Sequence, residues 1–546
     1  MPHDQPAPPR TSPRWRRHHW CAVLAILVLA LSVGWWSRPP EIGTAHDDAI
    51  YVALSYSLEQ GRYHDEYLLG APPHGKYPPG MALWIAAIRQ IAGPDLDAVR
   101  LGNLLLLALT ATLIGSAVCR LDSAWLGVGA VAVTALNPTL LQLTGQLYSE
   151  IPYIALATFA IWATLIADQD PRRRWPLLAS VSALAAFLTR LLGVALLPAI
   201  LVWALLRRRW TTAAGLGLVS AVTVGAWLAW SRNVAGSALG SSYAGDWQIM
   251  QGRGDDVTGT MLNRVVHNFV DYAAHMDFQV LALPMLRHSP VDNLLWLLLL
   301  APPAVVGLSL LMRRWPVAAI SAALTAGILL MWIAVTERLL SPLLPTAIAA
   351  LLLGGSHLGR RLFPRAPSLA VGLLTIALAG LALTAHISQY RWHNCDRRDP
   401  YADPGCYDAE SRSLVMATRF VRDSLPVNAV VASSKPATVY YFSGHRTVDL
   451  ASLLRRERAR GVLEWGPQGV NFLILSRTGP MERGRGLAMV NRHCRELSVR
   501  ATIPPSSTLV LAPRDSLSGT TDACSALAQF AADLRELTPQ ARILPP

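Results

Sequence analysis

The sequence predicts a polytopic α-helical membrane protein that ends in a small soluble α/β or α+β domain. Only 15% of its 546 residues are charged and 52% are hydrophobic, whereas soluble domains are about 25% charged. Long apolar runs alternate with short arginine clusters until the composition changes at Ile387. We therefore expect a transmembrane domain over residues 1–386 and a soluble domain over residues 387–546.

The first apolar run, Trp20–Trp36, follows several arginines, and no small-residue cleavage site comes after it. Because a cleaved signal peptide carries such a site, we interpret the run as an uncleaved signal anchor. Met81–Ile91 is too short to span a bilayer and predicts an interfacial helix. With the anchor, ten further runs predict eleven crossings: Val99–Val118, Trp125–Leu143, Ile151–Ala167, Trp175–Leu188, Leu191–Leu206, Thr212–Trp230, Leu294–Met312, Val317–Val335, Leu339–Leu353 and Ser368–Ala385.

The arginine clusters predict the orientation in the membrane. The runs on either side of Arg190 are short and could form one long helix, but that fusion would place arginine clusters on opposite sides. With eleven crossings and a cytoplasmic N-terminus, four clusters fall inside, as the positive-inside rule requires: Arg172–Arg174, Arg207–Arg209, Arg313–Arg314 and Arg360–Arg361. The net charge of +13 therefore indicates membrane flanks rather than a nucleic-acid partner.

The same topology places the residues of mixed charge on the outer face. Asp47 and Asp48 follow the anchor, and Lys76 ends the same polar stretch. Glu150, Arg190 and Arg338 stand at the outer ends of later crossings. Carboxylates can accept a proton from a hydroxyl, and cations can stabilise an anionic leaving group. We therefore expect these residues to form a site. His46 and His74 flank it, and we expect both to be surface histidines.

The tail after Ile387 predicts a small domain of strands and helices. Ser411–Asp423 and Ala523–Leu537 have a helical pattern. Four short runs rich in β-branched and apolar residues predict strands: Val427–Val431, Val439–Phe442, Val470–Leu475 and Ser507–Leu511.

Four of the six cysteines lie in this tail. On an oxidising outer face they could form two disulfides, and the simplest pairing joins Cys395 to Cys406 and Cys494 to Cys524. No spacing of cysteine, histidine and acidic residues predicts a metal site. The other two cysteines sit in apolar runs, where we expect them to be packed.

The outer-face motifs resemble those of the GT-C glycosyltransferases, above all the protein-mannosyltransferase and lipid A aminoarabinose-transferase branch. The acidic pair in Asp47-Asp48-Ala-Ile-Tyr51, the segment Lys76-Tyr-Pro-Pro-Gly80 and the segment Tyr148-Ser-Glu-Ile-Pro152 are similar to motifs of that branch. Thr189-Arg190 is also similar to a motif of that branch, and so is Arg338, which precedes Pro342 and Pro345. The chain departs from the pattern in having Asp48 where Glu is common, Gly80 where a bulky apolar residue is frequent, and Tyr77 between the lysine and its prolines.

This resemblance implies a glycosyltransferase that moves a sugar from a polyprenyl-phosphate donor to the hydroxyl of a lipid, glycan or protein acceptor. It implies a base at Asp47 or Asp48, and Glu150 as the residue that orients a hydroxyl. Lys76, Arg190 and Arg338 would bind the donor phosphate. The protein would lie in the inner or plasma membrane, in contact with membrane lipids, with its C-terminal domain outside the cytoplasm. Whether the reaction needs a divalent cation stays open, because some relatives of this fold use one and others use none.

Two other functions compete with this interpretation. A transporter or flippase for lipids or sugars could have the same number of crossings, but transporters place ionisable groups near the bilayer midplane, often in repeated halves. Here the polar groups stand at the ends of crossings, and no repeat is visible. A surface-anchored binding protein would not need eleven crossings as its anchor.

Overall fold

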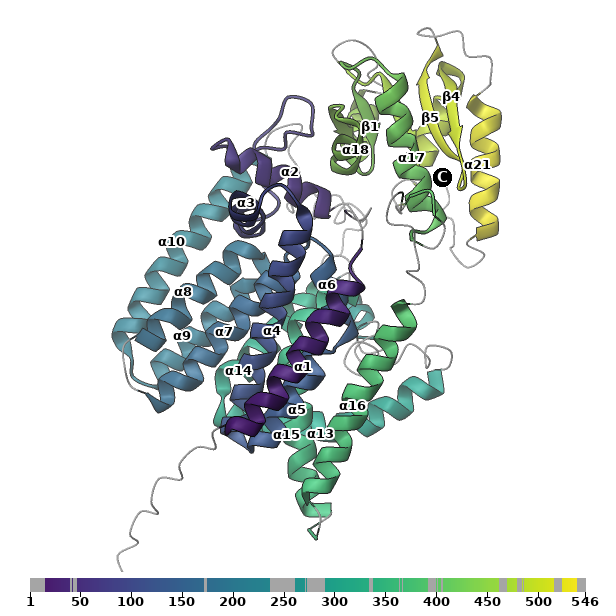
Figure 1. Ribbon diagram of the computed structural model, residues 1–546. Helices are drawn as coiled ribbons and strands as arrows, with labels where there is room; N and C mark the ends of the chain where they lie inside the picture. Colours follow the sequence, from purple (N-terminus) through teal and green to yellow (C-terminus); the bar gives the residue numbers. More distant parts are fainter. Residues whose placement is uncertain are drawn as a thin grey trace, which may run out of the picture.

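The computed structural model describes residues 15–39, 42, 47–170, 174–235, 261–270, 272, 290–332, 337–362, 364–365, 367–390, 399, 401–403, 406–460, 469–478, 484, 486–514 and 523–537. Helices form most of this part, and they pack side by side below a smaller unit made of the tail (Figure 1). The helices of the bundle, with two short 3-10 segments, are α1 (Arg17–Trp36), α2 (Asp47–Glu59), α3 (Gly80–Ala92), α4 (Leu96–Leu121), α5 (Ala124–Ala135), α6 (Pro138–Gly145), α7 (Glu150–Gln169), α8 (Arg174–Thr189), η1 (Leu191–Ala195), α9 (Leu196–Leu206), α10 (Trp210–Ala235), α13 (Pro290–Arg314), α14 (Pro316–Met331), η3 (Glu337–Leu343), α15 (Leu344–Leu362) and α16 (Pro367–Tyr390).

Each predicted apolar run overlaps one or two of these helices. Within the described residues five helices are long and apolar enough to cross a membrane, namely α1, α4, α7, Trp210–Val234 of α10 and Arg338–Leu362. A sixth crossing results if α5 and α6, which meet at an angle of 49°, count as one broken span. The protein is thus a multi-pass membrane protein by composition, and the number eleven stays a prediction.

Glycines bring α4 and α5 into close contact. A Cβ atom at Gly127 would lie 2.6 Å from the carbonyl oxygen of Gly115, and one at Gly115 would lie 2.7 Å from the carbonyl oxygen of Gly127. Small residues of this kind allow apolar helices to pack by backbone contact, which is a main source of attraction between helices in lipid. Helix α4 also packs against α7, which begins at Glu150.

The tail forms a five-stranded sheet in the order β2-β1-β3-β5-β4. Strands β1, β2 and β3 run parallel, whereas β5 is antiparallel to both β3 and β4. The elements of the tail are α17 (Ala409–Ser424), β1 (Val431–Ser433), α18 (Pro436–Ser443), β2 (Thr447–Asp449), α19 (Leu450–Arg460), β3 (Phe472–Leu475), α20 (Leu487–Arg492), η6 (Cys494–Glu496), β4 (Leu497–Ile503), β5 (Thr508–Pro513) and α21 (Ala523–Leu537). The described part of the tail thus contains a mixed sheet with flanking helices, while a separate C-terminal domain with its boundary at residue 387 stays a prediction.

The strand predicted at Val439–Phe442 is wrong, because this run lies in helix α18. Four apolar residues fit a strand and a buried helical turn equally well. The flanking residues decide the outcome. Pro436 occupies the first turn, where its missing N–H costs nothing, and Gly444 ends the helix in the left-handed conformation at φ 74°. Strand β1 is shorter and later than predicted, and the edge strands β2 and β4 were not predicted.

The tail contacts the first polar loop directly, at a place that we call the loop–tail junction (Tyr67–Leu69 against Thr447). The Leu69 N–H donates to the Thr447 carbonyl at 2.8 Å, and the Thr447 N–H donates to the Tyr67 carbonyl at 2.8 Å. These bonds form a parallel bridge at the outer edge of β2. Beside the junction, Ala437 of α18 shares an apolar cluster with α2, so the tail and the start of the bundle are joined by backbone and side chains.

The predicted disulfide between Cys494 and Cys524 is present and ties η6 to the first turn of α21. Cys406 is also disulfide-bonded, and Cys395 lies outside the described residues. Cys21 and Cys119 are not disulfide-bonded. Cys119 is buried, as expected, whereas Cys21 is exposed on the outside of α1.

Candidate active site

Four of the six predicted site residues meet at one end of the bundle. Asp47 opens α2 and Glu150 opens α7. Arg190 follows the last residue of α8, and Arg338 lies in the 3-10 segment η3 that leads into α15. These four positions are far apart in the sequence, but each is the end of a helix, and the helices end together on one side.

Two arginines and two carboxylates form a connected group. Arg338 forms an ion pair with Asp47, and its Nε atom lies 3.7 Å from Oε1 of Glu150. Arg190 approaches the same Glu150 oxygen from another helix, at 3.0 Å. The Glu150 side chain is 1% exposed, so two guanidinium groups compensate the charge of a buried carboxylate. Neither of its oxygens accepts a hydrogen bond from the part of the chain that the structure describes.

Three tyrosines line this group, and none was singled out from the sequence as a site residue. Tyr77 donates its hydroxyl to Asp47 Oδ1 at 2.9 Å. Tyr51 donates to the Ser149 hydroxyl at 3.1 Å, and Arg190 donates to the same oxygen at 3.0 Å. The Arg338 guanidinium lies 4.5 Å from the centre of the Tyr148 ring, a cation–π contact. Each tyrosine stands within four residues of a predicted acid or of Lys76, and this closeness in the sequence could have indicated that the tyrosines belong to the site.

Asp48 lies beside this group and is 1% exposed. Its Oδ1 atom accepts the Ala49 N–H at 2.9 Å. Burial raises the pKa of the Tyr148 phenol, and the nearby charge of Asp48 raises the pKa further. Tyr148 therefore stays protonated near neutral pH and can act only as a neutral hydrogen-bonding group.

Lys76 borders the group through its neighbour in the chain. Its Nζ atom lies 5.8 Å from the centre of the Tyr77 ring, and the Tyr77 hydroxyl contacts Asp47.

The departure from the family pattern at Gly80 has a structural reason. A Cβ atom there would lie 2.6 Å from the Thr189 hydroxyl oxygen and 2.7 Å from the Leu188 carbonyl oxygen. A glycine therefore lets the Lys76 segment pack against the residue that precedes Arg190.

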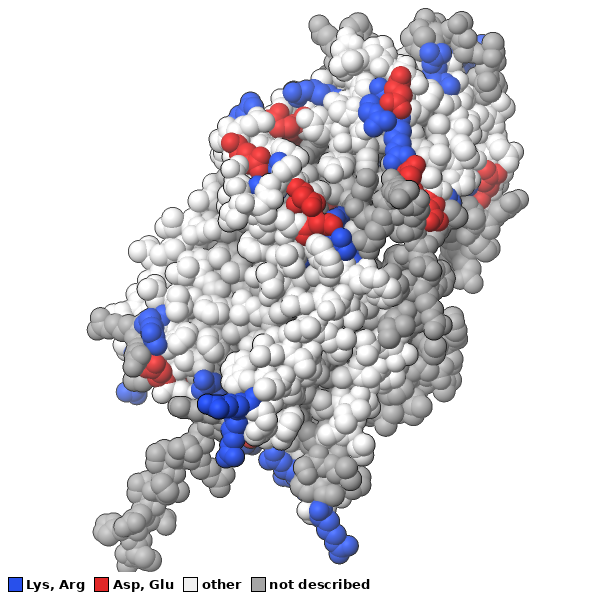
Figure 2. Space-filling model, viewed as in Figure 1, with Lys and Arg blue, Asp and Glu red and all other residues white. Residues whose placement is uncertain are grey.

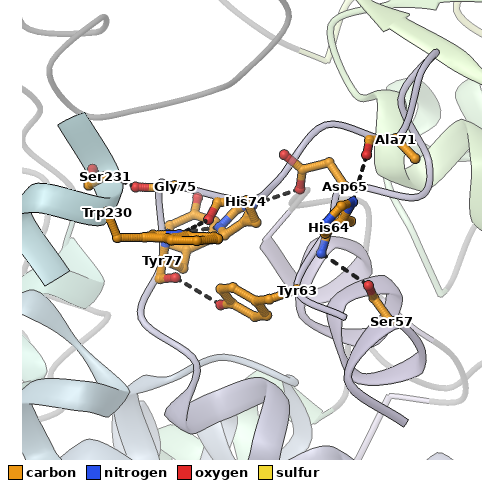
Figure 3. A network of polar contacts seen from close by, with 10 residues as sticks. All are labelled: Ser57, Tyr63, His64, Asp65, Ala71, His74, Gly75, Tyr77, Trp230 and Ser231. Atoms are coloured by element: carbon orange, nitrogen blue, oxygen red, sulfur yellow. Dashed lines mark hydrogen bonds and ion pairs between the residues drawn. The ribbon is translucent and has the colours of Figure 1, made fainter. Parts of the chain in front are cut away.

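The expectation that His74 lies on the surface is wrong, because this side chain is fully buried. The loop from Tyr63 to Tyr77, which we call the His74 loop, folds back on itself and packs against α10 (Figure 3). His74 lies in its interior, paired with the equally buried Asp65. Ser231 of the covering helix comes 156 residues after Gly75, so the residues near His74 in the sequence gave no signal of its burial. His46 lies outside the described residues.

The opposite end of the bundle differs in its charge. Arg207 pairs with Asp168 near the end of α7, and Arg209 donates to the Ala167 carbonyl. Arg360 pairs with Asp122 after α4. Figure 2 shows mainly basic side chains at this end, and mixed acidic and basic side chains beside the tail. Since α7 has 20 residues, it separates the two ends by about 30 Å, which is the thickness of a bilayer core.

The acids of the group do not fit a divalent metal ion. Asp47 and Glu150 are compensated by Arg338 and Arg190, and a divalent cation would have to share this space with two guanidinium groups. Among the described residues, no group of three or more histidine, cysteine or acidic side chains is placed to bind a metal.

Comparison with known proteins supports the fold. Residues 76–230 match the family model described as dolichyl-phosphate-mannose-protein mannosyltransferase. ArnT from Cupriavidus metallidurans in the apo state is similar over 92% of this chain and 100% of its own, with 13% identity and a TM-score of 0.53. The structure of the same protein bound to undecaprenyl phosphate is similar over 93% of this chain and 100% of its own, with 14% identity and a TM-score of 0.52.

A third structure, the Archaeoglobus fulgidus oligosaccharyltransferase in complex with Zn and sulfate, is similar over 89% of this chain and 73% of its own, with 14% identity and a TM-score of 0.51. No curated protein matches the sequence significantly. At these identities the likeness concerns the fold. The resemblance that the motifs indicate is thereby confirmed, and the chain has the fold of the GT-C glycosyltransferases.

Proposed function

We propose that this protein is a membrane glycosyltransferase that moves a sugar from a polyprenyl-phosphate donor to an acceptor hydroxyl. The observation that carries the proposal is the group of Asp47, Glu150, Arg190 and Arg338 at one end of the bundle. It combines an acid that can accept a proton with cations that can bind a phosphate. The likeness to a structure of ArnT bound to undecaprenyl phosphate supports this donor class.

In the proposed reaction Asp47 removes the proton from the acceptor hydroxyl, with Asp48 as the alternative base. The acceptor oxygen forms a bond to the anomeric carbon, the bond from that carbon to the phosphate oxygen breaks, and the polyprenyl phosphate leaves with the electron pair. Lys76, Arg190 and Arg338 stabilise its negative charge. Glu150 accepts a hydrogen bond from a hydroxyl of the sugar or acceptor, since both of its oxygens have capacity for one.

The ion pair between Asp47 and Arg338 suggests how the donor prepares the base. A carboxylate paired with a guanidinium stays ionised but is a weak proton acceptor, because a proton would break the pair. A donor phosphate competes for Arg338. When Arg338 turns to the phosphate, Asp47 loses the ion pair with Arg338 and accepts a proton more readily. Binding of the donor and activation of the acceptor are thus coupled through one arginine.

The proposed function is tested by incubating the purified protein with a panel of polyprenyl-phosphate sugars and measuring loss of the donor. Cleavage of one donor, with release of polyprenyl phosphate, supports a transferase. A flippase would instead move labelled lipid across a vesicle membrane and leave the sugar–phosphate bond intact. Transport without any cleavage across the panel would reject the proposal.

We also propose that the eleven predicted crossings place the site, the tail and its disulfides on the extracytoplasmic face of the inner or plasma membrane. Reporter fusions after Arg174, Arg209 and Arg361 should report the cytoplasm, because the basic end of the bundle carries these clusters. A fusion after Ala385 should report the outside. A cytoplasmic signal from this last fusion would contradict the arrangement.

Transfer should not depend on a divalent cation, since guanidinium groups already compensate Asp47 and Glu150. We expect the rate of sugar transfer to stay within a factor of about two when a chelator is added, because the cations that stabilise the leaving phosphate belong to the chain. The measurement is turnover with EDTA, followed by addition of Mg²⁺, Mn²⁺ or Zn²⁺. A loss of activity that one of these ions restores would overturn this prediction.

A further inference from the structure

The His74 loop is a tightly bonded unit between the site and α10. The Asp65 N–H donates to the Pro72 carbonyl and the His74 N–H donates to the Tyr63 carbonyl, each at 2.8 Å. From the far side, Trp230 donates to the His74 carbonyl at 2.8 Å, and Ser231 donates to the Gly75 carbonyl at 2.7 Å. The backbone on both sides of Gly75 is therefore fixed just before Lys76.

The two nitrogens of the His74 ring have different and complementary partners. Nδ1 lies 2.6 Å from Oδ1 of Asp65, and both side chains are fully buried. Nε2 lies 2.8 Å from the Tyr77 backbone nitrogen, which can only donate. Nε2 must therefore be the acceptor, and Nδ1 must carry the proton that it donates to Asp65. This assigns His74 as the neutral tautomer with hydrogen on Nδ1.

Tyr77 is held by the His74 loop on several sides. Its ring stacks on the His74 ring, with centroids 5.5 Å apart and planes inclined by 28°. Tyr63 stands edge-on to His74 and donates its hydroxyl to the Tyr77 carbonyl at 2.8 Å. The Tyr77 hydroxyl then reaches Asp47. A short chain of contacts therefore runs from Asp65 through His74 and Tyr77 to the proposed base.

We propose that His74 is a positioning residue for the transfer reaction, and that it acts on Asp47 through Tyr77. This inference rests on the proposed function. The Asp65 carboxylate fixes the tautomer of His74, the tautomer presents an acceptor to the Tyr77 N–H, and Tyr77 holds the Asp47 carboxylate by its hydroxyl. His74 itself does not touch the reacting atoms. Its contribution is to keep Asp47 in the geometry that proton transfer requires.

The test is a pair of substitutions that separate the two bonds of His74. In His74→Asn the amide occupies the place of Nδ1, so it keeps the bond to Asp65 and loses the one to Tyr77. In His74→Gln the longer side chain can reach the Tyr77 N–H again. We expect kcat to fall about tenfold in His74→Asn, as for one lost hydrogen bond, with KM for the donor unchanged, and to recover partly in His74→Gln.

The matched control is His64→Asn on the same loop. His64 contacts the Ala71 carbonyl at 2.9 Å through Nδ1, and an asparagine amide can keep that contact. We expect normal kcat for this variant. In addition, Tyr77→Phe should lower kcat about tenfold. The double variant with His74→Asn and Tyr77→Phe should be no slower than either single variant, because both changes break the same series of contacts from Asp65 to Asp47.

Several outcomes would overturn the proposal. Normal kcat in His74→Asn does so, and so does a double variant that is about a hundredfold slower, as expected for independent effects. If His74→Asn does not fold, Asp65→Asn is combined with Tyr77→Phe instead, and the double variant should again be no slower than either single variant.

Hydrogen exchange of the Tyr77 amide separates this inference from the proposed function. If the wild-type protein transfers no sugar, the proposed function fails, and exchange then decides the arrangement. Faster exchange in His74→Asn than in His64→Asn supports the hydrogen bond to His74 Nε2, and equal exchange rejects it.

Discussion

Replacing Asp47 by asparagine should lower the rate of sugar transfer by ~10² to 10⁴-fold, which is the usual loss on removal of a general base. Asparagine keeps the shape of the side chain and can still accept the Tyr77 hydroxyl at Oδ1. It removes the negative charge that pairs with Arg338. Donor affinity should therefore be retained or improved, because Arg338 is then free to bind the phosphate. The measurements are turnover and donor affinity in nanodiscs.

A control for Asp47→Asn lies on the same side of the bundle. Asp95 is exposed and caps α4 by accepting the Asp97 N–H, and asparagine caps a helix as well as aspartate does. Asp95→Asn should therefore leave both folding and transfer unchanged. If Asp47→Asn and Asp48→Asn both transfer sugar at the normal rate, the acidic pair is not catalytic and the proposed mechanism is wrong.

Replacing Arg338 by alanine should have the second large effect, because this one side chain serves two carboxylates and the proposed phosphate. Its loss leaves Asp47 without its ion pair and removes one of the two guanidinium groups beside Glu150. We expect a fall in kcat of ~10² to 10³-fold, as for removal of one group that stabilises a developing anion. Donor affinity should fall as well. Arg338→Lys should recover only part, since an ammonium group keeps the charge but lacks the planar fork of donors with which the guanidinium approaches both carboxylates.

Arg360→Ala is a matched control for Arg338, because Arg360 also pairs with an aspartate, Asp122, but at the other end of the bundle. It should transfer sugar normally. Lys76→Ala provides a useful contrast, since it should weaken donor binding and turnover without breaking the pair between Arg338 and Asp47. Normal transfer by both Arg338→Ala and Arg338→Lys would remove Arg338 from the mechanism.

The grouping of the charged residues could be predicted because topology alone decides it. Glu150 and Arg190 stand at ends of neighbouring crossings, and alternate ends of crossings must lie on the same side of a membrane. The pattern of apolar runs therefore contains the information. It does not contain which acid pairs with which arginine, because that depends on side-chain directions set by packing. The pairing of Arg338 with Asp47 joins residues 291 positions apart.

The role of His74 and the fold of Val439–Phe442 could not be predicted for a different reason. Both depend on contacts that form only after distant elements have packed. His74 is buried because Trp230 and Ser231 of α10 cover its loop. The helix α18 packs on α2, more than 370 residues earlier in the chain, where Ala437 completes an apolar cluster. Local periodicity describes how one segment prefers to fold, and it does not describe the surface that the segment will meet.

The loop–tail junction has a consequence for the tail as a separate polypeptide. In the whole chain, Tyr67 and Leu69 occupy the hydrogen-bonding groups of Thr447 on the outer edge of β2. A tail expressed without the bundle would expose that edge and the apolar side of α18 that faces α2. Bare edges of sheets pair with other chains and promote aggregation. The first polar loop therefore also covers the β2 edge and keeps it from pairing with the sheet of another molecule.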